Sequence, residues 1–294
     1  MGDPAEALLA LCRFPPAGTA VDLAVSGGPD SVGLWLLAQA AGLEVHVHHV
    51  DHGLRAASVR DAALVAEMGQ RLATPVTIHR TAVAPGPNLE ARARAARRGL
   101  LPAGALTGHT MDDLAETVLV NLLRGAGVDG LSPLVGDPTK PLIGLRRAAL
   151  RTFVEAAGVP FAHDESNDDL RFVRNRVRHQ VVPLLDAVAE RDVVPLLARQ
   201  AGLLAEERRW LDEVAADARA LGEVDCRELT SWPRARLRRW LRERLRLDEE
   251  RHPPSSAEVE RAIAVVEGHA RAAELGGGHR LSRSGRRLRL DEGG

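Results

Sequence analysis

An apolar segment that leads directly into a glycine-rich turn constrains the fold of this chain more than any other feature of its sequence. The segment Val21–Val25 has the pattern of a buried strand, and a Ser-Gly-Gly-Pro-Asp-Ser turn follows it. Gly27 and Gly28 are able to adopt positive φ angles and direct backbone N–H groups toward an anion, and Ser31 lies where it would cap a helix that begins near Val32. The pattern predicts a phosphate-binding loop, with an ordinary glycine-rich turn as the alternative. The Gly-Lys-Ser/Thr ending of a Walker loop is absent, which argues against a kinase or a GTPase.

Strand-like and helix-like segments alternate along the first half of the chain. Such alternation predicts an α/β fold with a parallel, Rossmann-like sheet and helices on both faces, and it places ligands at the carboxyl ends of the strands. The expected strands are Val21–Val25, Leu43–Val50, Val76–Val83 and Ala105–Thr107, and the expected helices lie near residues 32–40, 56–72, 89–101, 112–124 and 147–157.

The pattern changes after Pro183 to charged, helix-forming sequence. We therefore expect a catalytic domain at residues 1–185, and a linker helix with a smaller, mostly helical domain at residues 186–294. The expected elements of this second part are a helix at 186–221, an arginine-rich helix at 234–246, a further helix after Pro253–Ser256, and a closing hairpin at 275–290.

The composition limits the class of protein without identifying a partner. Acidic residues number 40 and basic residues 39, and the only lysine is Lys140, so a general arginine bias explains part of every arginine cluster. The amino terminus is acidic where a signal peptide is basic, and no apolar run is long enough to span a membrane, so we expect a cytoplasmic protein. Cys12 and Cys226 are the only cysteines, which excludes a cysteine-ligated iron–sulfur cluster.

The end of the second expected strand is rich in histidine. Four of the seven residues from His46 to His52 are histidines, which suggests a metal site. Strand alternation, however, sends His46 and His48 to one face and leaves no regular ligand spacing, so zinc is the less favoured interpretation. Asp51 lies just past the strand, where a carboxylate could face a nucleotide.

The segment after the fourth strand combines a histidine with two carboxylates. His109, Asp113 and Glu116 fall around the start of a helix, the last two one turn apart. Helix capping explains an aspartate at this place, but two carboxylates on one face also hold Mg²⁺ or bind and deprotonate an amine.

Two arginine-rich segments are open to two explanations. Arg94 and Arg97 are one helical turn apart, and three of the four arginines in Arg171–Arg178 recur at spacings of three and four, as on one helical face. Either pattern fits a solvated surface stripe or a site for phosphate groups.

Taken in order, these segments resemble bacterial tRNA(Ile)-lysidine synthetases, which belong to the PP-loop superfamily of N-type ATP pyrophosphatases. The resemblance covers nearly all of the first expected domain and is faint in the second. Its most specific parts are the 107–131 segment and the Arg-Asn-x-x-Arg-His run at Arg174–His179. Arg98 departs from the family, which has tyrosine there. The matching blocks are Ser26–Ser31, His48–Arg55, Asn88–Arg97, Thr107–Leu131, Pro141–Leu150 and Asp164–Leu185.

The resemblance implies a two-step reaction on the wobble cytidine of the isoleucine tRNA that carries a CAU anticodon. O2 of the base attacks the α-phosphorus of ATP and pyrophosphate leaves; the ε-amine of free lysine then attacks C2 and AMP leaves. The product, lysidine, changes the codon that is read from AUG to AUA.

This chemistry assigns expected roles to residues of the chain. The expected catalytic residues are Asp30, which also holds Mg²⁺, His109, Asp113 and Glu116. The expected ATP-binding residues are Ser26, Gly27, Gly28, Pro29, Asp30, Ser31, Asp51 and Arg94. The expected tRNA-binding residues are Arg171, Arg174, Asn175, Arg178 and His179.

Three other functions remain open at this point. A tRNA thiolase of the same ATPase group needs cysteines that this chain lacks, and a small-molecule amidating ligase has no need of the Arg174–His179 run. A tRNA-binding module that has lost catalysis is the third. Arginines also crowd the 234–246 helix and the closing hairpin, where either tRNA docking or pairing with nearby acids would explain them. The sequence leaves the oligomeric state open, a homodimer included.

Overall fold

The computed structural model describes residues 4–51, 58–81, 99–162, 168–219, 225–245 and 254–291. The chain forms two compact units, residues 1–205 and 206–294. The boundary expected at residue 185 separates a catalytic domain from the rest of the chain. The division into compact units does not test that boundary of function, so it stays a prediction.

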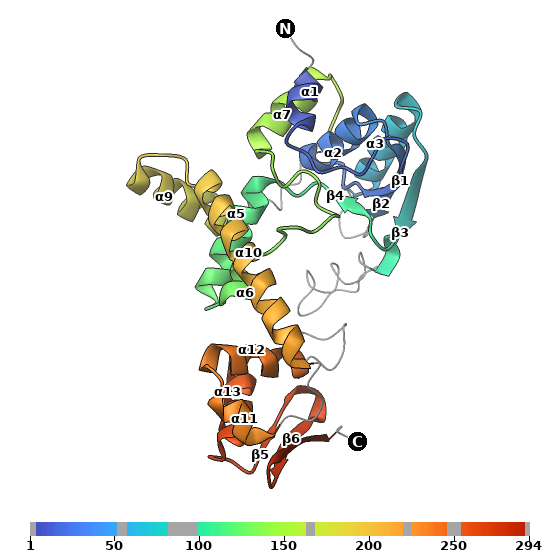
Figure 1. Ribbon diagram of the computed structural model, residues 1–294. Helices are drawn as coiled ribbons and strands as arrows, with labels where there is room; N and C mark the ends of the chain where they lie inside the picture. The colour runs from blue at the N-terminus through green and yellow to red at the C-terminus, as the bar shows by residue number, and fades with distance from the viewer. Residues whose placement is uncertain are drawn as a thin grey trace. The chain divides into compact units, whose positions relative to one another are not determined.

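The first unit is built on a four-stranded sheet with the strand order β3-β2-β1-β4 (Figure 1). All three pairings are parallel, with Leu23 of β1 opposite Val47 of β2 and Leu106 of β4. This confirms the predicted parallel α/β sheet. Its elements are α1 (Pro4–Leu9), β1 (Ala20–Ala24), α2 (Pro29–Ala40), β2 (Glu44–Asp51), α3 (Ser58–Arg71), β3 (Val76–Arg80), β4 (Leu106–Thr107), α5 (Met111–Leu123), α6 (Val128–Leu131), α7 (Arg147–Ala156), α8 (Val173–Arg176), a π-helical turn (Val177–Val181), α9 (Val182–Ala189) and the first half of α10 (Val194–Arg219).

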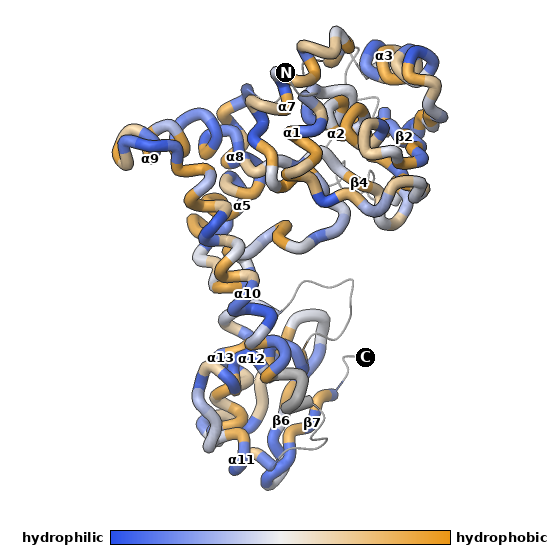
Figure 2. The backbone as a smooth tube through the Cα atoms, turned by 45° about the horizontal axis from the view of Figure 1, so that its top comes forward, coloured by the Kyte–Doolittle hydropathy of each residue, from blue (hydrophilic) through white to orange (hydrophobic). Residues whose placement is uncertain are grey.

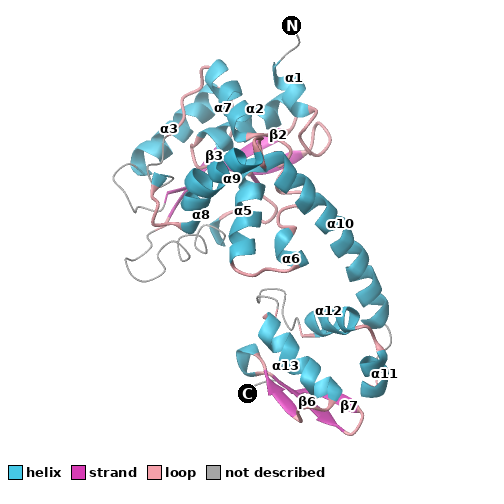
Figure 3. Cartoon of the chain, turned by 90° about the vertical axis from the view of Figure 1, so that its left-hand side faces the viewer, coloured by secondary structure: helices cyan, strands magenta, loops and turns pink. Residues whose placement is uncertain are grey.

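The core of the first unit lies between one face of the sheet and the helices α2, α3 and α7, which gather on the same side of the strands (Figures 1 and 3). Leu23 and Val47 are fully buried in it beside Trp35, whose indole N–H donates to Thr74 Oγ1 at 3.1 Å. Each such side chain contributes about 1.5–3 kcal/mol through burial of apolar surface. Figure 2 shows hydrophobic and hydrophilic residues mixed along α3, as expected of a helix with one buried face. The residues that alternate with this core in β1 and β2 include Asp22, His46 and His48, so the two faces of the sheet differ in chemistry.

The helix after the glycine turn begins earlier than expected. Pro29 is the first residue of α2 and Gly28 is its N-cap, so Ser31 lies inside the helix and is not its cap. Proline favours the first helical position because its fixed φ suits the helix and its missing N–H would be unpaired there. Of the two glycines only Gly27 has a positive φ, +91°; Gly28 is extended.

The long helix expected at residues 186–221 is two helices. α9 ends where Glu190 adopts a left-handed conformation with φ 51°, and α10 begins at Val194. Carboxylates from both sides fix this corner: Asp186 accepts the Val193 N–H at 2.8 Å and Asp192 accepts the Val194 N–H at 3.0 Å.

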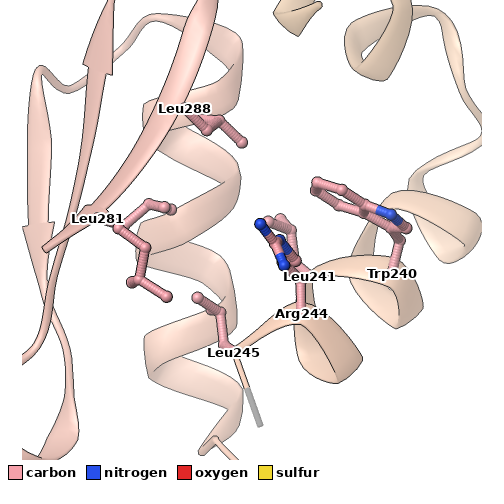
Figure 4. Close-up of a pocket in the computed structure, with 7 residues that line it drawn as sticks. Trp240, Leu241, Arg244, Leu245, Leu281 and Leu288 are labelled. Carbon is pink, nitrogen blue, oxygen red and sulfur yellow. The ribbon is translucent and has the colours of Figure 1, made fainter. Parts of the chain in front are cut away.

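The second unit packs helices on a small antiparallel sheet, which agrees with the expectation of a mostly helical part and of a closing hairpin. Beyond the end of α10, its elements are α11 (Cys226–Ser231), α12 (Arg234–Arg244), α13 (Ser256–Glu267), β5 (Ala272–Glu274), a 3₁₀ turn (Gly276–Gly278), β6 (Arg280–Ser284) and β7 (Arg287–Asp291). The sheet has the order β5-β6-β7, and the core contains Leu241, Ile263 and Leu281. Figure 4 shows a pocket where α12 faces the hairpin; at about 40 Å³ it has room for little more than a water molecule, so it belongs to the core.

None of the described helices combines the length and the apolar character that a membrane-crossing helix needs.

Candidate functional site

The glycine loop, residues 26–31, connects β1 to α2 at the carboxyl end of the sheet. Its two serines bind each other: Ser31 Oγ lies 3.2 Å from Ser26 Oγ and accepts the Ser26 N–H at 3.2 Å. Ser31 Oγ also donates to Gly28 O at 2.9 Å. These bonds shape the turn, and no side-chain hydrogen bond from the described residues caps the start of α2, a place where the helix dipole favours an anion.

Two close backbone approaches hold the loop in place. The carbonyl of Gly27 accepts the Ala162 N–H at 2.8 Å. A Cβ atom at Gly108, in the segment after β4, would lie 2.6 Å from the carbonyl oxygen of Asp30. Only glycine fits at that distance, so the segments after β1 and β4 meet backbone to backbone.

Three acidic side chains meet next to this loop. Asp30 comes from the first turn of α2, and Asp113 and Glu116 come from the first turns of α5. Asp113 also closes a capping box, because its Oδ2 accepts from the Thr110 N–H and from the Thr110 hydroxyl, each at 2.9 Å. Asp113 therefore uses Oδ2 for the helix cap and keeps Oδ1 for contacts within the site, while its expected catalytic role stays a prediction.

Arg147 joins the three carboxylates. Its Nε donates to Asp30 Oδ2 at 3.1 Å, and its Nη1 donates to Glu116 Oε1 at 3.0 Å. Its Nη2 lies 3.0 Å from Asp113 Oδ1, an ion pair without hydrogen-bond geometry. One guanidinium thus connects acids from two helices.

Two further arginines contact the same acids from the segment that leads into α9. Arg174 donates to Glu116 Oε2 at 2.9 Å and to Asp113 Oδ1 at 3.0 Å, and Arg178 donates to Glu116 Oε1 at 2.7 Å. Arg178 lies in the π-helical turn, a local geometry that recurs at functional sites. We call this set the acid–arginine cluster: Asp30, Asp113, Glu116, Arg147, Arg174 and Arg178.

The surroundings separate the pKa values of the three acids. Burial raises the pKa of Asp30, and the charge of Arg147 offsets only part of that effect. Burial acts in the same direction on Asp113, but the charges of Arg147 and Arg174 outweigh it and lower its pKa. Burial of Glu116 is likewise outweighed, chiefly by its hydrogen bond from Arg178, so its pKa is also lowered. Asp113 and Glu116 are therefore held ionised, whereas Asp30 is the acid that most lacks a cation.

The second oxygen of Asp30 fits a metal ligand. Asp30 Oδ1 is buried and has no hydrogen-bond partner among the residues that the structure describes. Mg²⁺ takes oxygen ligands, needs only one or two carboxylates from a protein, and completes its shell with water and phosphate oxygens. The site therefore has the donor that Mg²⁺ requires beside the loop expected to hold phosphates.

Comparison with known proteins relates this site to a family. The family model of the PP-loop domain matches residues 7–185. The tRNA(Ile)-lysidine synthase of Nocardia farcinica is 35% identical over 270 residues, which cover 86% of this chain and 84% of that protein. The chain belongs to the tRNA(Ile)-lysidine synthase family. The family member from Thermus thermophilus is 42% identical over 228 residues, which cover 72% of this chain and 44% of that protein.

Two further comparisons concern the length of the chain relative to members of the tRNA(Ile)-lysidine synthase family and the similarity of its fold to a solved structure. The chain spans about half the length of several of the curated relatives that it matches, at 44% to 51% of each. Among solved structures, the U34-tRNA thiolase NcsA from Methanococcus maripaludis has a similar fold, with a TM-score of 0.53, 14% identity, and coverage of 69% of this chain and 78% of that one.

The structure brings His109 beside the cluster. Its Nδ1 lies 2.7 Å from Thr107 Oγ1, and its charge when protonated would help to lower the pKa of Asp113. Asp51 ends β2 and is buried.

The remaining expected residues lie elsewhere or outside the described residues. Arg171 precedes α8 and pairs with Asp169 on the surface, whereas Arg174 and Arg178 contact the acids of the cluster. Asn175 is buried and donates to Asp169 O at 2.9 Å. His179 lies 3.7 Å from Asp168. Arg94 falls outside the described residues, and His52, Arg55, Arg97 and Arg98 do as well.

Arg147 is the site residue that the sequence reasoning did not assign. It is the first residue of α7, and Arg146 is the N-cap. A cation at a helix N-terminus opposes the helix dipole by a few tenths of a kcal/mol or more. Two consecutive arginines at a helix start were therefore a readable signal, because a sequence that breaks a local rule often does so at a functional site.

Proposed function

We propose that the chain ligates free lysine to C2 of the wobble cytidine of the isoleucine tRNA with a CAU anticodon, using ATP and Mg²⁺, in the cytoplasm. The observation that supports this most is that Asp30 of the glycine loop, Asp113 and Glu116 all contact the guanidinium of Arg147. A cationic amine and a polyphosphate need opposite charges at neighbouring places, and this cluster supplies both.

In the first step we expect O2 of the cytidine to attack the α-phosphorus of ATP, with pyrophosphate leaving. The glycine loop would bind the pyrophosphate through its backbone N–H groups and the open helix start. Mg²⁺, when held by Asp30, would neutralise charge on the phosphate oxygens. The base has to leave its stack for the attack, so the rest of the tRNA must be held meanwhile.

In the second step we expect the ε-amine of lysine to attack C2, with AMP leaving. Asp113 and Glu116 would bind the ammonium group and take up its proton, and His109 would help to orient the reacting groups.

The charge balance of the cluster suggests how substrates enter. Three carboxylates face three guanidinium groups, so the formal charges cancel without ligand. Phosphate groups would draw Arg174 and Arg178 away from the acids, because arginine forms paired hydrogen bonds to phosphate. The acids would then need another cation, and the lysine ammonium is that cation. ATP binding would in this way prepare the lysine site.

A thiolase is not favoured, although the solved structure with a similar fold is a thiolase with a 4Fe-4S cluster. Such a cluster takes three or four cysteine ligands, and the chain has two cysteines, one in each unit. Burial raises the pKa of the Cys12 thiol to about 12, so it is also a poor nucleophile.

The proposal is tested with the full chain, ATP, Mg²⁺, labelled lysine and a panel of tRNAs. We expect label in the CAU isoleucine tRNA, none in the methionine tRNA that shares its anticodon letters, and pyrophosphate release only when the first tRNA is present. A module without catalysis would bind tRNA and release no pyrophosphate. Absence of label with every tRNA would contradict the proposal.

A further inference from the structure

The face of the sheet opposite the main core carries a group of polar side chains that the proposed reaction does not use. Asp22 is on β1, and His46 and His48 are on β2. Asp22 is the register partner of His46, which brings the three side chains to one face of two neighbouring strands. Asp22 and His46 are 40% and 43% exposed, whereas His48 is 8% exposed.

The potential ligand atoms of this group are close together. Asp22 Oδ1 lies 2.8 Å from His48 Nε2 and 3.8 Å from His46 Nδ1, and all three atoms are within 4.8 Å of one another. A tetrahedral zinc ion with bonds of about 2.0–2.1 Å separates its ligand atoms by about 3.3–3.4 Å. The observed distances lie on both sides of that value, so shifts of about 1 Å in these side chains would close the site.

The outward nitrogen of each histidine is already held. His46 Nε2 lies 2.9 Å from Thr77 Oγ1, and His48 Nδ1 lies 3.0 Å from His79 Nε2, both partners belonging to β3. Histidines that bind metals show this arrangement, since a partner on the second nitrogen fixes the tautomer and the orientation of the ring. When His48 Nε2 binds a metal, His48 Nδ1 carries the proton, and His79 Nε2 lies where it could accept that N–H.

We propose that Asp22, His46 and His48 bind one Zn²⁺ ion, with Thr77 and His79 supporting the two imidazoles. Two imidazoles and a carboxylate suit zinc, whereas Mg²⁺ prefers oxygen ligands alone, so this site differs in chemistry from the one at Asp30. Three protein ligands leave one position for water. The ion would join β1 to β2, the strands that lead into the glycine loop and to Asp51, and would stabilise the folded chain because the unfolded chain lacks the site.

The sequence alone disfavoured zinc because strand alternation leaves His46 and His48 on one face without a regular ligand spacing. The third ligand lies more than twenty residues earlier, and the supporting residues lie on β3. Only the pairing of three strands brings them together.

The test is a titration of metal-free, full-length chain with Zn²⁺, followed by calorimetry, in the presence of millimolar Mg²⁺. We expect one Zn²⁺ per chain and a rise in the midpoint of thermal unfolding. His48→Ala and Asp22→Asn should each weaken binding by more than about tenfold, and Thr77→Val by about tenfold. His269→Ala, an exposed histidine of the second unit, is the matched control and should bind as the wild type does.

Because His48 is buried, far-ultraviolet circular dichroism has to show that its variant folds, and His46→Ala, at an exposed position, repeats the test. Failure of the wild type to bind Zn²⁺, or unchanged affinity in the folded variants, would overturn the proposal and leave a hydrogen-bonded chain from His79 through His48 to Asp22. The readout is metal binding, so either result is independent of lysine transfer.

Discussion

Arg147 determines the charge balance of the candidate site. Its side chain is 22% exposed and contacts three carboxylates, of which Glu116 is almost fully buried. Without the guanidinium, Asp30 and Asp113 would face each other with less compensating charge. Removing one partner of a buried ion pair costs about 3–5 kcal/mol, because the other charge stays buried.

We therefore expect Arg147→Met to lower the free energy of unfolding by about 3 kcal/mol at pH 7.5. Arg151→Met, on the same helix but in an exposed pair with Glu155, should change it by no more than about 0.5 kcal/mol. Urea unfolding followed by circular dichroism measures both.

The pKa values of Asp113 and Glu116 are lowered in the fold, so their stabilising contribution is present above about pH 4 and is lost as the pH falls through those lowered values. The effect of Arg147→Met should shrink over the same range; equal losses for the two arginine variants would contradict this account.

The pKa of Asp30 is shifted in the direction opposite to those of Asp113 and Glu116, so its effect on stability has the opposite dependence on pH. Its pKa is raised by burial, so its ionisation costs stability as the pH rises above the unfolded-state value near 4, and the full cost is present above the folded-state value. We expect Asp30→Asn to raise the unfolding midpoint at pH 7.5 in the absence of divalent ions and to abolish the additional stabilisation that Mg²⁺ with ATP gives the wild type. Thermal melts with and without Mg²⁺ and ATP test this. A variant that is less stable than the wild type and responds normally to Mg²⁺ would remove Asp30 from the metal site.

At the scale of elements, the site depends on two loops that touch at Gly108 and Asp30. The distance of 2.6 Å to the Asp30 carbonyl is to backbone, which cannot rotate away. We expect Gly108→Ala to cost about 1–3 kcal/mol and to weaken ATP binding by shifting the glycine loop. Gly202→Ala, where a Cβ meets nothing within 4 Å, should be neutral or stabilising. Isothermal titration with ATP and urea unfolding measure the two effects, and normal ATP affinity in Gly108→Ala would argue against the proposed role of this backbone approach.

Local patterns were sufficient to predict most elements, because alternation and periodicity report burial directly. Residues 21–25 were expected as a strand that forms at Ala20–Ala24, and residues 112–124 as a helix that forms at Met111–Leu123. The break between α9 and α10 was missed because Glu190 is a helix former, although Asp192 and Pro195 are typical of a helix start.

The candidate site could be predicted only in part, for a related reason. Three of its residues follow parallel strands: Asp30 comes after β1, and Asp113 and Glu116 come after β4. The parallel sheet alone therefore predicts that they lie at the same edge. Arg147 follows no strand. The two arginines at the start of α7 marked the position as unusual, but the contact of Arg147 with the acids depends on the packing of α7 on α2, which no local pattern reports. The same holds for Arg174 and Arg178, whose helical spacing was visible but whose contact with the acids was not.

At the scale of the whole molecule, the contacts of the arginines in the second unit indicate which of them could bind tRNA. Arg234 and Arg238 on α12 pair with Glu260, and Arg239 pairs with Asp212. Pairing with acids therefore accounts for part of the crowding on this helix, although those acids are not the sequence neighbours first considered. Exposed arginines also lie on the closing hairpin: Arg280, Arg286, Arg287 and Arg289.

If the second unit binds tRNA, we expect the positive charge of the hairpin arginines to contribute to the affinity. We expect Arg286→Ser to weaken tRNA binding and to reduce the slope of log affinity against log salt by up to about 0.9 for each phosphate group that the variant no longer neutralises. Replacement of Arg234 and Arg238, which are already paired with acids, should leave that slope nearly unchanged. Filter binding at several salt concentrations measures both. Equal slopes for the wild type and the hairpin variant would assign the second unit a structural role.

The central claim is that the acid–arginine cluster is where lysine is joined to tRNA. The most direct measurement is the single-turnover rate of labelled lysine transfer to the CAU isoleucine tRNA by the wild type, Asp113→Asn and Glu155→Gln. The amide oxygen of asparagine is able to accept the capping bond from Thr110, but asparagine removes the charge that would bind the ammonium, and circular dichroism checks that the variant folds. We predict a loss of about 100-fold or more for Asp113→Asn, with tRNA affinity unchanged, and no loss for the exposed Glu155→Gln. A folded Asp113→Asn chain that transfers lysine at the wild-type rate would contradict the account.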